Sequence, residues 1–423
     1  MSSTQHPPEI PSANPIDPVE HDYFTLNPAP ASLQKHTSLA RDFITTHASA
    51  GRRVVLVTSG GTTVPLERQT VRFIDNFSAG TRGATSAEYF LEAGYAVIFL
   101  YREFSLLPYS RHYSHATNCF LDFLHEGPDG SVLAREEYTE KMLAVLRKYQ
   151  AAKRDNLLLT IPFVTINDYL FILRSIAQLM RPLGPSGLLY LAAAVSDFFV
   201  PNERMVEHKI QSTDAVLWRD KKRDELVTPL HRKSPNIRPQ GAEDRQDQGQ
   251  QDEEAFDNFD SSPLIPRSKR LVIDLDPVPK FLKNLVDGWA PEGMIVSFKL
   301  ETDPEILVSK ARYSLERYQH HLVIGNLLVT RKWEVVFVAR SEEGEGIREE
   351  WIRVPRRRKT LSKIDIEVDR EGGGEDGGEK GKERPLDPKD LPDYEPEIEI
   401  ESLIIPAVKK LHDTYIQRNS RES

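Results

Sequence analysis

Short runs of apolar, β-branched residues alternate with segments of helical periodicity along most of this 423-residue chain. The run Arg53–Thr58, RVVLVT, is nearly continuous in apolar residues, as in a strand that is covered on both faces. Parallel strands need a crossover of a dozen or more residues between them, which is usually a helix. The alternation therefore predicts an α/β protein with a doubly wound, mainly parallel sheet in three layers, α/β/α.

The predicted elements lie in two blocks, residues 31–212 and 269–340, which we expect to form a single α/β domain. The predicted strands are residues 53–58, 95–101, 156–161, 188–195, 270–275, 294–300, 322–327 and 334–339. The predicted helices are residues 32–48, 136–152, 167–179, 278–289 and 304–320, with one more that starts near Thr81.

The segments outside these blocks have a different composition. Residues 1–30 are polar and Pro-rich and are predicted to be a disordered tail. Residues 213–268 are predicted to be a flexible polar insertion, and residues 341–396 a charged linker. Residues 397–417 are apolar enough for a C-terminal helix docked on the core, although Pro406 opposes a helix outside its first turn.

Composition excludes several classes of protein. The formal net charge of −9 and the pI of about 5.8 disfavour a nucleic-acid-binding protein. No apolar run reaches the roughly 18 residues of a membrane helix, and the N-terminus lacks the features of a signal peptide. We therefore expect a cytoplasmic protein, with the nucleus as the open alternative. The single cysteine, Cys119, rules out an internal disulfide and a cysteine-based zinc site.

Residues 191–211, LAAAVSDFFVPNERMVEHKIQ, combine a buried strand with polar groups at its carboxyl end. In open α/β sheets, ligands bind at such strand ends. Ala193 and Ala194 leave room for a flat group against the backbone, and Asp197 suits ribose hydroxyls or a hydrated metal ion. Lys209 is a mobile point charge suited to phosphate oxygens. No residue is assigned as a direct metal ligand.

Two glycine-containing segments are candidates for binding an anion. TSGGTT, with Gly60 and Gly61, directly follows the first strand, although it also fits an ordinary turn; it is neither GxGxxG nor a Walker A loop. The second segment, RFIDNFSAGTRG, precedes a helix whose N-terminus favours negative charge. Its candidate residues are Arg72, Asn76, Ser78, Gly80, Arg82 and Gly83. A capped helix with two surface arginines remains open as the alternative.

Two later strand ends also carry candidate residues. Phe298, in SFKLET, is able to stack on a nucleotide base, but it fits equally well as a core aromatic on a buried strand. Asn326 ends the following strand. Polar groups at four strand ends along one sheet edge are hard to explain by chance.

RFIDNFSAGTRGATSAEYFLEAGYAVIFLYR, AAAVSDFFVP, EHKIQS and SFKLETDP together resemble the phosphopantothenate–cysteine ligase family, of the eukaryotic single-function type. The resemblance covers about residues 33–212 and 269–340 and implies a Rossmann-like catalytic domain. It also implies a homodimer that acts in coenzyme A biosynthesis. The expected substrates are 4′-phosphopantothenate, L-cysteine and ATP, with Mg²⁺, rather than the CTP of bacterial members.

The resemblance also assigns roles to residues. Asn76 stands where the family's asparagine acts on the acyl-nucleotide intermediate, and Lys209 is the first lysine of a KIKK-like loop, here HKIQ. The positions that match the nucleotide and substrate pocket are Gly60, Ser78, Gly80, Gly83, Ala193, Ala194, Asp197, Phe298 and Asn326. The residue types and their positions also assign Gly61 to the nucleotide site, and Arg72 and Arg82 to the substrate site.

The implied reaction has two halves. The phosphopantothenate carboxylate attacks the α-phosphate of ATP to give an acyl-adenylate and pyrophosphate, and the cysteine amine then displaces AMP. A nicotinamide- or flavin-dependent oxidoreductase is the alternative, but it would need GxGxxG after the first strand, where this chain has SGGTT. A non-catalytic scaffold is a further alternative, and it would be expected to lack Asn76 or Lys209.

Overall fold

The computed structural model describes residues 18–114, 120–210, 273–341, 346–355 and 384–422. The chain divides into two compact units. The larger unit comprises Met1–Thr63, Asp75–Ser196 and Pro279–Ser423, and the smaller comprises Val64–Ile74 and Asp197–Val278. The predicted insertion at 213–268 lies outside the described residues.

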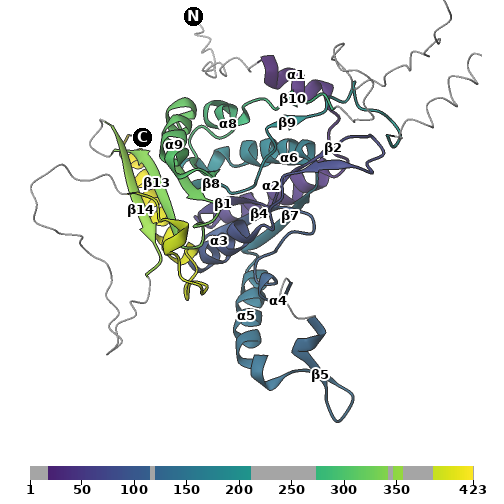
Figure 1. Cartoon of the computed structure of the whole chain (residues 1–423), viewed down its shortest axis with the longest axis vertical. Helices are drawn as coiled ribbons and strands as arrows, with labels where there is room; N and C mark the ends of the chain where they lie inside the picture. The colour runs from purple at the N-terminus through teal and green to yellow at the C-terminus, as the bar shows by residue number, and fades with distance from the viewer. Residues whose placement is uncertain (1–17, 115–119, 211–272, 342–345, 356–383, 423) are drawn as a thin grey trace, which may run out of the picture. The chain divides into compact units, whose positions relative to one another are not determined.

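An eight-stranded sheet forms the centre of the larger unit (Figure 1). Its order is β14 (Ile347–Arg353), β13 (Glu334–Arg340), β12 (Leu322–Leu327), β11 (Met294–Glu301), β8 (Gly187–Leu191), β1 (Val54–Ser59), β4 (Ala96–Arg102) and β7 (Leu158–Phe163). The six strands from β12 to β7 are parallel, and β13 and β14 are antiparallel. The parallel strands follow the order 3-2-1-4-5-6, which confirms the predicted doubly wound, Rossmann-like fold.

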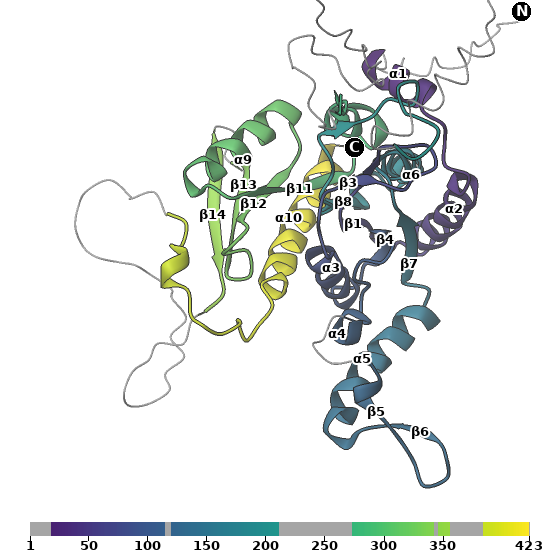
Figure 2. The same cartoon turned by 45° about the vertical axis from the view of Figure 1, so that its right-hand side comes forward.

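Helices cover both faces of the sheet, and alternate strand residues face each layer. Leu322 and Ile324 of β12 belong to a core cluster with α3 (Thr81–Glu92) and α10 (Glu401–Glu422). Val323 and Leu327 pack instead with residues of α9 (Pro304–Tyr318). Figure 2 shows α10 beside α3, and α2 (Leu33–Ser49) with α6 (Ile166–Leu179) on another side.

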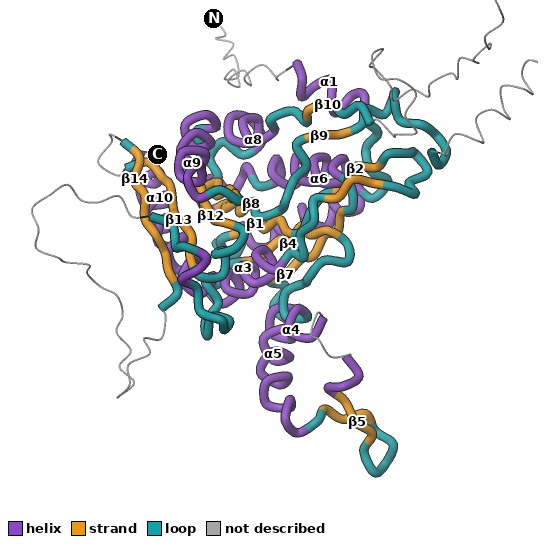
Figure 3. The backbone as a smooth tube through the Cα atoms, in the orientation of Figure 1, coloured by secondary structure: helices purple, strands orange, loops and turns teal. Residues whose placement is uncertain are grey.

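Shorter elements complete the two units. Between β4 and β7 lie α4 (Arg111–Ser114), η1 (Phe120–Phe123), the hairpin β5 (Leu124–Glu126) with β6 (Val132–Ala134), and α5 (Glu136–Arg154). Helix α5 and the hairpin project from the sheet (Figure 3). The other short elements are η2 (Arg181–Ser186), η5 (Pro388–Asp390), the pair β2 (Thr63–Pro65) and β3 (Phe73–Asp75), and the pair β9 (Phe198–Phe199) and β10 (Asp276–Pro277).

The prediction of a disordered tail over residues 1–30 is wrong for its second half. Helix α1 (Pro18–Leu26) places two aromatic rings against the core. The ring of Tyr23 lies 5.2 Å from that of Phe281, and the ring of Phe24 lies 4.8 Å from that of Phe171. The proline content of the segment hid this short aromatic anchor. Residues 1–17 lie outside the described part.

The predicted charged linker, residues 341–396, contains the edge strand β14. Ile347 and Trp351 pack with one core cluster and Ile352 with the other, while charged residues occupy most other positions. Charged residues are common on edge strands because they oppose pairing with other chains. That same charge made the strand look like a solvated spacer.

Three other boundaries differ from the prediction. Strand β8 ends at Leu191, so Ala192–Val195 form a loop rather than strand. Residues 273–275, predicted as strand, are irregular, and 270–272 lie outside the described part. The predicted helix 278–289 is divided into α8 (Phe281–Asn284) and one π-helical turn, η4 (Leu285–Trp289).

Candidate active site

The sheet order reverses between β1 and β8, and the loops that follow these strands are joined there. The N–H of Ala194 donates to the Gly60 carbonyl (2.8 Å), and the N–H of Thr62 donates to the Ala194 carbonyl (3.0 Å). The N–H of Ala193 donates to the Thr58 hydroxyl (3.1 Å). Ligands bind in α/β sheets at such a switch point. The structure therefore brings together Gly60, Ala193 and Ala194, which the sequence placed in the site.

Asn76 lies directly against the glycine loop. Its N–H donates to the Thr62 carbonyl (3.2 Å). A Cβ atom added to Gly61 would lie 1.6 Å from the carbonyl oxygen of Asn76, which is shorter than any non-bonded contact. Gly61 is thus required for the close approach that sets the backbone of Asn76.

The first turn of α3 has the features of an anion-binding helix start. Gly80 caps it in the left-handed conformation (φ 81°) and, as a glycine, supplies no capping side chain, while its own N–H donates to the Ser78 hydroxyl (3.4 Å). The N–H groups of a helix's first turn carry partial positive charge and are suited to phosphate. Gly83 lets α3 approach β1, since its Cβ would lie 2.5 Å from the side chain of Ser59. Ser78 lies two residues before the cap, half-buried.

Asn326 and Phe298 lie on neighbouring strands, β12 and β11. Asn326 is paired in register with Leu300 and is buried. The half-buried ring of Phe298 packs edge-on against Tyr190 at 5.2 Å and belongs to the core cluster of α3 and α10. The core interpretation of Phe298 therefore has structural support, and base stacking stays a prediction.

The two candidate arginines are both held by protein groups. Arg82 donates to the Glu401 carboxylate (2.7 Å) and to the Arg331 carbonyl (2.6 Å). In the smaller unit, Arg72 donates to Glu67 (3.2 Å) and to the carbonyl of Ile210 (2.7 Å). These bonds occupy part of each guanidinium group. The contact of Arg72 and Arg82 with substrate stays a prediction.

Glu67 organises the loops of the smaller unit. Burial would raise the pKa of this carboxyl group, but N–H groups of Arg72, Ile210 and Val71 and the Arg72 guanidinium hold it below its usual value. The carboxylate thus joins residues 71–72 to the end of the predicted catalytic loop. The sequence reasoning missed Glu67, because a single glutamate in a loop carries no recognisable pattern.

Asp197 and Lys209 also belong to the smaller unit, and both are exposed. The carbonyl of Asp197 accepts a hydrogen bond from Val278 (2.9 Å), next to the β9–β10 pair. Arg204, in the same segment, pairs with Asp274 and Asp276. The chain around Asp197 is therefore fixed by backbone pairing and ion pairs.

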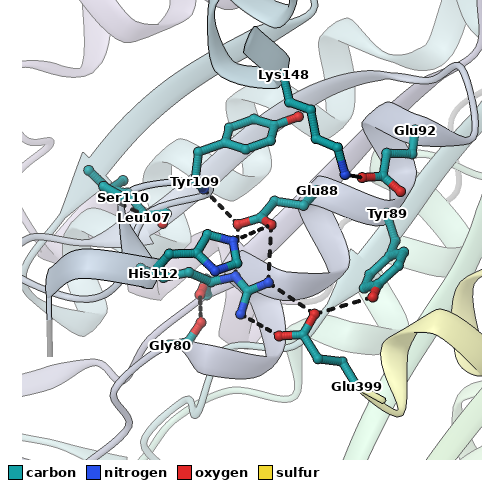
Figure 4. A network of polar contacts seen from close by, with 12 residues as sticks. Gly80, Glu88, Tyr89, Glu92, Leu107, Tyr109, Ser110, His112, Lys148 and Glu399 are labelled. Carbon is teal, nitrogen blue, oxygen red and sulfur yellow. Dashed lines mark hydrogen bonds and ion pairs between the residues drawn. The ribbon is translucent and has the colours of Figure 1, made fainter. Parts of the chain in front are cut away.

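A buried carboxylate anchors the other end of α3 (Figure 4). Glu88 accepts hydrogen bonds from the N–H of Tyr109 (2.6 Å), from Arg111 (2.7 Å) and from His112 (3.1 Å). Burial would raise the pKa of Glu88, but these partners hold it below its usual value. Arg111 also pairs with Glu399 (2.6 Å), which connects the network to the segment before α10.

The residues that the structure describes contain no group of three or more His, Cys, Asp or Glu side chains placed to hold a metal ion. None of the helices in the described ranges is long and apolar enough to cross a membrane.

The strand order and the helix start at its switch point define a Rossmann-like α/β protein with a site suited to an anionic ligand. No family model matches the chain. It is 44% identical over 350 residues to the phosphopantothenate–cysteine ligase CAB2 of Saccharomyces cerevisiae, covering 82% of this chain and 84% of the yeast protein. The human phosphopantothenate–cysteine ligase is 40% identical over 329 residues (77% and 88%). The chain therefore belongs to the phosphopantothenate–cysteine ligase family and is an enzyme of the ligase class.

A solved structure agrees with this assignment. A Cab2 variant in complex with phosphopantothenate-cysteine is 39% identical and aligns with a TM-score of 0.67, over 95% of this chain and 99% of that one. The resemblance predicted from the four sequence segments is thus confirmed, and the oxidoreductase alternative is not favoured.

Proposed function

We propose that this protein joins 4′-phosphopantothenate to L-cysteine with ATP, through an acyl-adenylate, as a step of coenzyme A biosynthesis. The observation that carries the proposal is the high identity to the yeast and human ligases, together with the complex of the Cab2 variant with phosphopantothenate-cysteine. The juxtaposition of Asn76, Gly60 and Ala194 at the switch point supports it.

Different residues are assigned to the two halves of the reaction, adenylation and amide formation. Attack of a carboxylate on a phosphate brings two anions together, so positive charge is needed at the α-phosphate. The N–H groups at the start of α3 are suited to supply part of this charge, and the family resemblance assigns the ammonium of Lys209 to the same half of the reaction. The amide of Asn76 then orients the acyl group while the cysteine amine attacks.

We also propose that ATP binds as its Mg²⁺ complex. In phosphate-transfer sites Mg²⁺ is usually held by one or two carboxylates together with the phosphates and water. The exposed carboxylate of Asp197 fits that requirement. When bound, the ion would neutralise phosphate charge.

The test is the release of AMP from ATP. AMP and pyrophosphate should appear in equal amounts when phosphopantothenate and cysteine are both present, and pyrophosphate alone should accumulate to about one equivalent without cysteine. AMP release that is independent of phosphopantothenate, or no AMP release at all, contradicts the proposal. Competition between ATP and CTP in the same assay tests the choice of nucleotide.

The homodimer remains a proposal that rests on the family resemblance, and the cytoplasmic location remains one that rests on the composition of the sequence. Light scattering of the purified protein should give twice the chain mass of 48.2 kDa. A monomer that retains full ligase activity would contradict the dimer. Fluorescence microscopy of the tagged chain tests the location.

A further inference from the structure

An apolar cavity lies beneath α5, away from the switch point. It has a volume of about 340 Å³, within the range of small-ligand pockets. We call it the α5 cavity. Its walls come from α5, from β7, from α4 and from the loop before it, and include Leu107, Tyr109, Tyr113, Val145, Tyr149 and Leu158.

The protein leaves part of this apolar wall open to solvent. Leu146 and Tyr149 line the cavity, yet they are 48% and 40% exposed. An apolar group that entered the cavity would remove this surface from water, which is favourable. The lining of the cavity is therefore suited to an apolar ligand.

Lys153 indicates the charge of that ligand. It is the one charged side chain among the residues that line the cavity, and it is exposed. Within the described part of the chain it forms no ion pair, and its ammonium lies 5.9 Å from the ring of Tyr149. A carboxylate beside Lys153 would satisfy this charge while the rest of the ligand lies among the tyrosines.

The loop between the cavity and the candidate active site is short and firmly anchored. Tyr109, a cavity residue, has a left-handed backbone (φ 67°), and its N–H is held by Glu88 at 2.6 Å (Figure 4). Three residues earlier, the N–H of Leu106 donates to the Ala79 carbonyl (2.9 Å), next to the cap of α3. The hydroxyl of Ser105 would lie 3.1 Å from a Cβ on Gly80. A ligand that shifts Tyr109 therefore acts on a loop that is hydrogen-bonded to Ala79, the residue before the cap of α3.

We propose that the α5 cavity is an effector site for an amphipathic anion, an apolar chain that ends in a carboxylate. Binding at this site stands independently of the ligase activity, whereas its effect on turnover rests on the proposed function.

Calorimetric titration of the full chain with decanoate, below its micelle concentration, tests the site. The wild type should bind decanoate, and Val145→Trp, which fills the cavity, should bind at least tenfold more weakly. Leu143→Trp is the matched control, because Leu143 lies on α5 but does not line the cavity. Equal binding by the wild type and V145W, or no binding by the wild type, would overturn the proposal.

Charge reversal tests the recognition of the head group. Lys153→Glu should weaken decanoate at least tenfold and create binding of decyltrimethylammonium, while decanol binding should change less than twofold. Equal affinity of the wild type for decanoate and decanol contradicts an anion site. A changed molecular mass of V145W in light scattering, without decanoate binding to the wild type, would instead identify the cavity as a protein interface.

Steady-state kinetics test whether decanoate binding in the α5 cavity affects the candidate active site. Decanoate should change the KM for ATP at least twofold in the wild type and not in V145W, whose basal turnover should equal that of the wild type. Decanoate that binds without any kinetic effect would overturn the effector role. Calorimetry detects decanoate binding without turnover. Absence of AMP release in the wild type and in every variant would therefore count against the proposed ligase reaction and not against the binding site.

Discussion

The guanidinium of Arg82 lies 2.7 Å from the carboxylate of Glu401, although the two residues are 319 positions apart. The pair joins the first turn of α3, at the candidate active site, to the first turn of α10. Both side chains are mostly buried, 18% and 8% exposed. The C-terminal helix thus contributes to positioning the helix that would hold the nucleotide phosphates.

Removal of Arg82 should therefore destabilise the protein. Arg82→Ala leaves the buried Glu401 without its ion-pair partner, so we expect the free energy of unfolding to fall by about 3 kcal/mol. Glu401→Ala should lower it by a comparable amount, and Arg82→Met with Glu401→Leu should recover most of the loss. Urea denaturation measures all three. An R82A enzyme with unchanged stability and a raised KM for phosphopantothenate would show instead that Arg82 serves the substrate.

Asn76→Ala should separate the two halves of the reaction. Because the amide is assigned to the acyl group, pyrophosphate formation should persist, and amide formation should slow by roughly 100-fold. Rapid-quench measurement of pyrophosphate and of the phosphopantothenoylcysteine product follows each half. Equal slowing of both halves would reject this role for Asn76.

Lys209→Gln should have the opposite pattern. The lost positive charge acts where two anions meet, so pyrophosphate formation itself should slow by roughly 100-fold. The same quench experiment applies, and the control is Lys283→Gln, an exposed lysine on α8. Normal adenylation in K209Q would remove Lys209 from the first half.

Gly61→Ala tests the close approach of the glycine loop to Asn76. The new methyl group would meet the Asn76 carbonyl at 1.6 Å, so the loop must move. Because a shift of about 1 Å costs roughly 100-fold in rate, the turnover number should fall by about that factor. Gly288→Ala is the control, since nothing lies within 4 Å of its added Cβ. Unchanged turnover in G61A would show that the loop and Asn76 move independently of each other.

The free energy of unfolding should fall in mild acid because of two buried histidines, His412 in α10 and His320 just after α9. Burial lowers the pKa of His412 to about 4 and that of His320 to about 3. The unfolded chain, with histidine pKa values near 6.5, takes up protons first, so their stabilisation is complete above about pH 6.5 and declines toward pH 4. Each histidine contributes a slope of about 1.4 kcal/mol per pH unit.

Denaturation of His412→Gln checks this slope. The Nε2–H of neutral His412 donates to the Pro185 carbonyl (2.8 Å), and its Nδ1 accepts from the Tyr95 hydroxyl (2.9 Å). The variant should be less stable at pH 7 but lose less stability between pH 7 and pH 5 than the wild type. The control His208→Gln, at an exposed position, should keep the wild-type slope. An unchanged slope in H412Q would exclude His412 as its source.

Local patterns predicted the parallel core correctly, and they supplied the candidate site residues. The nearly continuous apolar run of residues 53–58 identified a buried strand, observed at Val54–Ser59, and the glycine before Thr81 identified a helix start. Segments in which apolar residues are interspersed with charged residues or prolines were predicted wrongly. The charged face of β14 concealed an edge strand, and the prolines around α1 concealed Tyr23 and Phe24, whose order depends on distant aromatic partners.

The sequence alone determined the fold class, the family and the residue types at the strand ends, because each depends on local periodicity or on contiguous motifs. Tertiary structure alone decided which groups those residues contact. The bonds of Arg82 to Glu401, and of Arg72 to Glu67 and Ile210, join segments whose side chains meet only after folding. The packing of Phe298 on Tyr190 was decided in the same way. The sequence shows which residues are charged or aromatic. The tertiary fold determines which residue each of them pairs with or packs against.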